Sequence, residues 1–259
     1  MKYFVIDVFT DKLFGGNPAG VCLLGFWPDD AVMQNIAMEN NLAETAFLVG
    51  EDGGSYGLRW FTPKVEIDLC GHATLASAFV LMNEVNAVSD RVDFHTHSGT
   101  LTVTKSGDIF TMDFPSRAPV RCDVPPLLEQ ALGVPVLETH VSRDLLVLLD
   151  SEDVVRHLRP DFAQLKQFDS VFAIIVTASG KDCDFVSRFF APRAGIPEDP
   201  VTGSSHCTLI PFWSKRLGKK CMNARQLSPR GGSLICEDCG ERVKIGGTAM
   251  CYLRGEISL

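Results

Sequence analysis

A block of sequence that occurs twice constrains the fold of this chain more than any other feature. Residues 59–74 read RWFTPKVEIDLCGHAT, and residues 188–206 read RFFAPRAGIPEDPVTGSSH. Each copy predicts a strand, a loop with a proline, an acidic turn, and then a glycine at which a helix begins. The two arginines that open the blocks stand 129 residues apart in a chain of 259 residues. The pattern therefore predicts that one half of the protein repeats the other.

Three pairs of glycines keep nearly the same register between the halves: Gly71 with Gly203, Gly99 with Gly232, and Gly107 with Gly240. Their offsets are 132, 133 and 133 residues. Chance similarity between short glycine-rich turns is the alternative, but it does not explain the agreement in both order and spacing. Such a long period excludes a solenoid. We therefore expect two duplicated domains, residues 1–116 and 117–259, joined through a proline-containing linker at residues 115–126.

Each half combines many predicted strands with one strongly apolar helix, at residues 73–82 and 204–217. A helix that is apolar on nearly every side is buried. A sheet can bury such a helix only by curling around it. The expected fold class is α+β, with two pseudo-symmetric domains, each a curled and mostly antiparallel sheet around a central helix, and a cleft between the domains. Residues 11–20 are expected to form a loop.

Charge and hydropathy exclude two classes of protein. The net charge is −8 and the pI is about 5.2, whereas nucleic-acid binders need clustered Lys and Arg for phosphate contacts. No apolar run approaches the length of a membrane span. The N-terminal residues 1–7 predict a strand rather than a signal peptide. We expect neither nucleic acid nor membrane as a partner.

The chain has nine cysteines, an odd number, and they are scattered along the sequence. This distribution is typical of reduced thiols in a cytoplasmic protein. Cys236 and Cys239 have CxxC spacing, but no second such pair accompanies them. The segment also corresponds to a predicted hairpin turn at residues 105–108, which contains no cysteine. We therefore expect no metal site, although a structural zinc or redox role for this pair stays open.

Both predicted buried helices begin at a glycine, Gly71 and Gly203, followed by a His or Ser. A helix N-terminus carries unpaired N–H groups and partial positive charge, and glycine lets a ligand approach the backbone closely. Two such ends that face one cleft would bind a carboxylate without a cation. The alternative is that the glycines only satisfy turn geometry, with Ser204 as a plain helix cap.

Four motifs carry a resemblance to a known family: residues 17–20 (NPAG), 41–47 (NLAETAF), 68–74 (DLCGHAT) and 199–204 (DPVTGS). In this order they resemble the PhzF-like isomerases of phenazine biosynthesis, a family related to diaminopimelate epimerase. The resemblance spans the whole chain. It implies the duplicated fold, an isomerase that uses no cofactor, and a homodimer.

The resemblance also implies roles for single residues. Glu44 matches the acid that shuttles the proton, while His72 and Asp199 match polar residues that orient the substrate and assist proton transfer. Gly71, Gly203 and Ser204 match the cradle of the substrate carboxylate. Without the resemblance, Glu44 could be an exposed residue at a strand start, His72 a helix-start histidine and Asp199 a capping acid.

One departure separates this chain from the related epimerases, which use two cysteines, one ahead of each glycine. Cys70 precedes Gly71, but Val201 and Thr202 stand before Gly203, and Cys207 lies inside the helix. We therefore expect an isomerase that moves a proton, and with it a double bond, in a small carboxylate-bearing metabolite, with Cys70 as a packed thiol. An epimerase or racemase of an amino-acid-like substrate and a non-catalytic binding protein are the alternatives. The sequence leaves open the substrate, any phenazine pathway, the dimer interface and a reactive role of Cys70.

Overall fold

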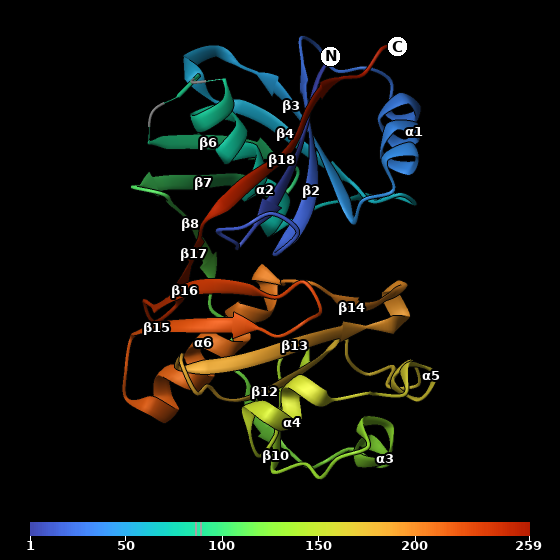
Figure 1. The fold of residues 1–259 in the computed structure, drawn as a ribbon, viewed down its shortest axis with the longest axis vertical. Helices are drawn as coiled ribbons and strands as arrows, with labels where there is room; N and C mark the ends of the chain where they lie inside the picture. Colours follow the sequence, from blue (N-terminus) through green and yellow to red (C-terminus); the bar gives the residue numbers. More distant parts are fainter. Residues whose placement is uncertain (86, 89) are drawn as a thin grey trace. The chain divides into compact units, whose positions relative to one another are not determined.

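The computed structural model describes residues 1–85, 87–88 and 90–259, and it contains two compact units (Figure 1). The first unit comprises Met1–Asp113 and Gly246–Leu259, and the second comprises Phe114–Ile245. The first boundary lies close to the predicted one at residue 116. The predicted place of residues 246–259 is different, since these residues belong to the first unit and not to the second half. The reason is that β18 (Ala249–Glu256) pairs antiparallel with β1 (Lys2–Val8).

A sheet in the first unit curls around one helix, α2 (Gly71–Phe79). Its strands lie in the order β18, β1, β2 (Asn17–Leu24), β3 (Glu44–Gly50), β4 (Tyr56–Phe61), β6 (Arg91–Thr96), β7 (Gly99–Ser106) and β8 (Ile109–Pro115), with β5 (Glu66–Ile67) beside β4. The β2–β3 and β4–β6 pairs are parallel, and the other pairs are antiparallel. Helix α2 contacts β1, β2 and β3 and also β7, so strands from distant parts of the sheet enclose it.

Further helical segments complete the first unit. A π-helical segment, η2 (Val80–Glu84), continues α2, and a 3-10 turn, η1 (Asp52–Gly54), follows β3. Helix α1 (Asp30–Asn40) covers the outer face of the sheet, where its Met33 and Ile36 pack with Phe47 and Phe61. The sheet therefore has apolar residues on both faces, α2 on one and α1 on the other.

The second unit repeats this arrangement around α6 (Gly203–Leu217). Its strands are β9 (Val120–Cys122), β10 (Glu138–Val141), β11 (Leu145–Leu148), β12 (Ile174–Ser179), β13 (Phe185–Ala191), β14 (Ile196–Asp199), β15 (Cys221–Gln226), β16 (Gly232–Asp238) and β17 (Arg242–Gly247). Trp213 of α6 stacks on Phe185 with ring centroids 5.6 Å apart, and its indole N–H donates to Thr177. Helix α6 also contacts β15 and β16, so this sheet curls as well.

The outer face of the second sheet is covered by three short helices: α3 (Leu128–Leu132), α4 (Glu152–His157) and α5 (Phe162–Leu165). Their apolar residues form one cluster with the residues of β11, β12 and β13 that face these helices. A 3-10 turn, η3 (Pro192–Ala194), joins β13 to β14. Within the described residues, no helix combines the length and the apolar character that crossing a bilayer requires.

Strand pairing confirms the duplication predicted from the sequence. The parallel pairs β2–β3 and β4–β6 of the first unit have counterparts in β11–β12 and β13–β15 of the second. The repeated arginines make the same contact, because Arg59 donates twice to Glu66 and Arg188 donates twice to Glu198. The predicted α+β class, with a curled sheet around each apolar helix, is confirmed.

Two local predictions are wrong. The predicted loop at residues 11–20 ends earlier, because β2 begins at Asn17, which lies opposite Val8 of β1. The predicted linker at residues 115–126 contains β9, which pairs with β10. In both cases the pairing partner, and not local periodicity, determines the strand. The turn that holds Cys239 is as predicted: Gly240 has φ 86°, and its counterpart Gly107 has φ 59°.

Candidate active site

Glu44 is the first residue of β3, a strand enclosed by β2 and β4. Side chains alternate along a strand, so Glu44 shares a face with Ala46 and Leu48, opposite Phe47, which packs with the residues of α1. Only 8% of Glu44 is exposed. This burial excludes the alternative of an exposed acid at a strand start. A buried carboxylate is costly unless a partner compensates for its lost hydration.

His72 is the partner of Glu44. It is the second residue of α2 and is 7% exposed. Its Nε2 lies 3.1 Å from Oε2 of Glu44. Within the described residues, neither of these two buried atoms has a hydrogen bond of acceptable geometry, so the contact is a close ion pair rather than an aligned hydrogen bond. The Glu44 carboxylate therefore keeps lone pairs that His72 does not use.

The other ring nitrogen of His72 faces two further side chains. Its Nδ1 lies 3.6 Å from Sγ of Cys70 and 3.5 Å from Nδ2 of Asn17. Cys70 precedes α2, and its side chain makes no capping hydrogen bond. Asn17 opens β2 and belongs to the NPAG motif. That motif carries part of the family resemblance, but nothing in the sequence indicates a role for Asn17, which lies against the imidazole.

Burial and charge act in opposite directions on His72. Burial alone would lower the pKa of its imidazole, but the interactions of the ring with Cys70 and Glu44 outweigh burial and raise the pKa well above its ordinary value. Burial also raises the pKa of the Cys70 thiol, so this thiol is neutral near pH 7. The site therefore holds the His72 imidazole and the Glu44 carboxyl group beside a neutral thiol.

Asp199 is the last residue of β14 and belongs to a hydrogen-bonded loop ahead of α6. Its carboxylate accepts a short hydrogen bond from the hydroxyl of Thr202. Gln226 fixes the same loop: its side-chain N–H donates to the backbone carbonyl of Asp199 at 2.8 Å, and its Oε1 accepts from the backbone N–H of Thr202 at 2.9 Å. Gly203 and Ser204 then begin α6, and Thr202 makes no side-chain cap.

Arg143 lies beside the start of α6, a contact that the sequence did not predict. Its Nη2 donates to Oγ of Ser204 at 3.3 Å. The guanidinium also binds Asp144, whose side chain is fully buried, and lies 4.8 Å from the ring centroid of Phe172. The sequence predicted a carboxylate site without a cation, whereas this helix start has one. Arg143 precedes Ser204 by 61 residues, and no sequence motif links the two.

The structure thus assembles the predicted residues in two groups. In the first unit Glu44 and His72 meet beside Gly71, the first residue of α2. In the second unit Asp199, Gly203 and Ser204 lie together at the start of α6. The cleft expected between the domains stays a prediction, and so do the assigned roles of these six residues.

The buried His206 of α6 should make the folded protein less stable in acid. Its Nδ1–H donates to the carbonyl of Thr202 at 2.8 Å, and burial lowers its pKa to about 4. The unfolded chain, with an ordinary histidine pKa, takes up this proton first, so stability present above about pH 6.5 is lost as the pH falls toward 4. The loss amounts to roughly 3 kcal/mol. His206→Gln should remove it, as measured by urea unfolding at pH 7 and pH 4.

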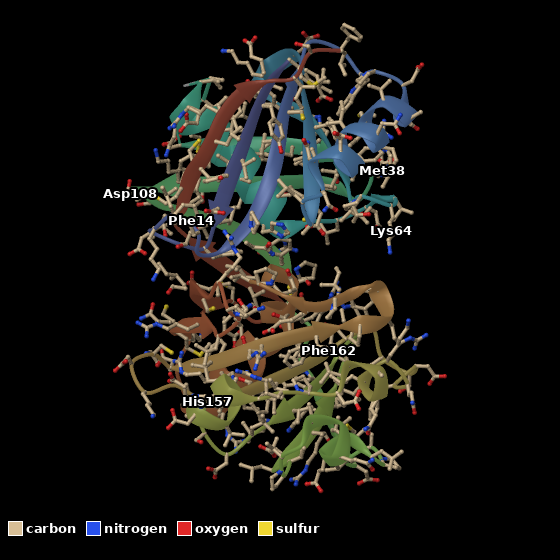
Figure 2. All side chains as sticks on the ribbon, turned by 45° about the vertical axis from the view of Figure 1, so that its right-hand side comes forward. Phe14, Met38, Lys64, Asp108, His157 and Phe162 are labelled. Atoms are coloured by element: carbon tan, nitrogen blue, oxygen red, sulfur yellow. The ribbon has the colours of Figure 1, made fainter. Side chains whose placement is uncertain are left out.

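The control for this prediction is His157→Gln, at the exposed end of α4 (Figure 2). That variant should lose as much stability between pH 7 and pH 4 as the unchanged protein. Equal acid losses in His206→Gln and the unchanged protein would contradict the prediction.

Comparison with known proteins shows which family the chain resembles. A model of the phenazine biosynthesis-like protein family matches residues 6–255. An uncharacterized isomerase of Pseudomonas aeruginosa is 49% identical over 259 residues, which are 100% of this chain and 99% of that protein. The crystal structure of a phenazine biosynthesis PhzF-family protein from Enterococcus faecalis aligns with a TM-score of 0.97 and 50% identity, covering 100% of this chain and 99% of that one.

A more distant structure extends the likeness of fold. A predicted epimerase from Pseudomonas aeruginosa aligns with a TM-score of 0.76 at 19% identity, over 99% of this chain and 98% of that one. The two units, each with a sheet curled around a helix, are thus the epimerase-like fold. Since the family model covers nearly all of the sequence and near-half-identical relatives are named isomerases, the chain belongs to the phenazine biosynthesis-like (PhzF) family and is an isomerase.

Proposed function

We propose that the protein is a cofactor-independent isomerase that moves a proton, and with it a double bond, in a small carboxylate-bearing metabolite. Glu44 is the proton shuttle. The observation that carries the proposal is the buried Glu44 carboxylate, whose Oε2 has no hydrogen bond within the described part of the chain and lies 3.1 Å from His72. A base that works on carbon needs a dry environment and a free lone pair.

In this mechanism Glu44 accepts a proton from one carbon of the substrate and returns it to another. The electron pair of the broken C–H bond forms the new double bond. The electron pair of the old double bond binds the returned proton at the other carbon, so the double bond shifts. The adjacent His72, whose raised pKa favours the charged ring, holds the Glu44 carboxyl group in place. Asn17 and Cys70 flank the opposite ring nitrogen and restrict the orientation of the ring.

The substrate carboxylate is proposed to bind at helix N-termini. Neither α2 nor α6 has a capping side chain at its N-cap residue, so first-turn N–H groups at Gly71, Gly203 and Ser204 have no such acceptor. Asp199 is proposed to orient the substrate from the loop before α6. Independence from a cofactor, the homodimer, the cytoplasmic location and the absence of nucleic-acid and membrane partners stay predictions based on the sequence.

An epimerase of an amino-acid-like substrate is the second candidate. It is favoured by Cys70, whose thiol stands directly before Gly71 and 3.6 Å from the imidazole. Against it, burial raises the pKa of that thiol, whereas a nucleophilic or basic cysteine needs the thiolate.

Deuterium incorporation tests the proposal. The protein, dialysed against a chelator, is incubated in heavy water with a panel of small unsaturated and amino carboxylic acids, and the products are read by NMR. An isomerase places deuterium on a carbon other than the one that lost its proton. Deuterium at the original stereocentre, with inversion, would replace the proposal by the epimerase. Exchange that requires an added cofactor would contradict the cofactor-free mechanism.

A further inference from the structure

The start of α2 brings together three different metal-ligating atoms. A carboxylate oxygen of Glu44, the sulfur of Cys70 and a ring nitrogen of His72 all lie within 4.8 Å of one another, and all three residues are buried. Tetrahedral zinc, with bonds of roughly 2.0 to 2.3 Å, holds neighbouring ligand atoms about 3.3 to 3.8 Å apart. Because Cys70 faces Nδ1 and Glu44 faces Nε2, the imidazole or the Glu44 side chain must turn before one ring nitrogen, the sulfur and the oxygen bind the same ion.

A second observation also indicates a ligand. Oε2 of Glu44 and Nε2 of His72 are buried 3.1 Å apart as an ion pair, and neither makes a well-aligned hydrogen bond within the described chain. Buried polar atoms normally have well-aligned partners, and an ion bound to both atoms would supply one. The types of ligand atom indicate which metal ion would bind. A thiol and an imidazole suit zinc-like ions, whereas magnesium and calcium prefer oxygen ligands.

We propose that Glu44, Cys70 and His72 form a binding site for a zinc-like divalent cation, and that this ion inhibits the isomerase. On binding, the Cys70 thiol releases its proton to solvent, and a protonated His72 releases one as well. The metal then occupies the lone pairs that Glu44 needs for proton transfer. Three protein ligands leave the fourth tetrahedral position open to water.

The test of the site uses cobalt(II) as a spectroscopic probe of the purified full-length chain. We expect a thiolate-to-cobalt charge-transfer band that zinc abolishes by displacement and that excess magnesium leaves unchanged. Cys70→Ser should lose the band and weaken zinc binding at least tenfold. The matched control is Cys239→Ser, which removes an exposed thiol and should leave both unchanged. His72→Gln, with its fold checked by circular dichroism, provides a second loss of a ligand.

Three results would overturn the site: no cobalt band, a band that survives in Cys70→Ser, or zinc affinity unchanged in both Cys70→Ser and His72→Gln. The inhibitory part rests on the proposed isomerase. It predicts that zinc suppresses deuterium exchange at least tenfold and that a chelator restores it. Zinc binding with undiminished exchange would overturn inhibition alone. A protein without exchange on any substrate would count against the proposed function, while the cobalt band would still decide whether the site exists.

Discussion

Replacing Glu44 by glutamine should lower the rate of substrate deuterium exchange by about 10²- to 10⁴-fold, the usual contribution of a positioned general base. Glutamine has nearly the same shape but cannot accept a proton from carbon. Because Glu44 lies in an enclosed strand and is 8% exposed, no bulk water replaces its function. Exchange is measured by NMR in heavy water with the substrate that the panel identifies.

The matched control is Glu51→Gln, at an exposed Glu–His pair of the same unit. Oε2 of Glu51 lies 2.5 Å from Nδ1 of His95, and both side chains are at least one-third exposed. This variant loses the same chemical group from a similar pair and should keep the rate of the unchanged protein. If Glu44→Gln retains full exchange, or if both variants lose it alike, Glu44 is not the shuttle.

The duplicated fold could be predicted because its signals are local and occur twice. The two arginine blocks and the paired glycines each describe a strand end, a turn or a helix start in a few residues. Their offset alone is enough to indicate two similar domains. The two bidentate pairs, Arg59 with Glu66 and Arg188 with Glu198, show that the repeated letters encode the same contact.

The wrong predictions depend on pairing between distant segments. The return of β18 to β1 joins residues nearly the full chain length apart, as in the pairing of Lys2 with Glu256. Nothing in the alternation of residues 249–256 identifies that partner. The short strand β9 and the early start of β2 depend on partners in the same way, since a strand is stabilised by its neighbours more than by its own propensity.

The candidate site also contains residues that local motifs predicted and residues that only the fold brings together. Motif resemblance led to Glu44 and His72, and the structure places them 3.1 Å apart. Arg143 and Gln226 were not predicted, because each reaches the start of α6 from a distant strand or turn and belongs to no motif. Side chains that support a site from afar become visible only when the fold brings them together.

Replacing Arg188 by methionine should destabilise the second unit by about 3–5 kcal/mol, the cost of breaking a buried ion pair from one side. The Arg188 side chain is 6% exposed and donates twice to Glu198. It also donates to the carbonyls of Val155 and Leu158 at the end of α4, which would lose their donor. Methionine keeps the apolar stem but leaves a carboxylate and two carbonyls unsatisfied. Hydrogen exchange of peptides from β13 and α6 measures the loss in opening free energy.

The repeat supplies the matched control, Arg59→Met in the first unit. The Arg59 side chain is 16% exposed and pairs with Glu66 and Asp30, of which Asp30 is 74% exposed. Solvent can replace much of that interaction, so we expect a loss on the order of 1 kcal/mol, read from peptides of β3 and α2. Combining Arg188→Met with Glu198→Gln should recover part of the loss, because the uncompensated charge disappears. Equal losses in the two single variants would show that burial does not distinguish the paired arginines.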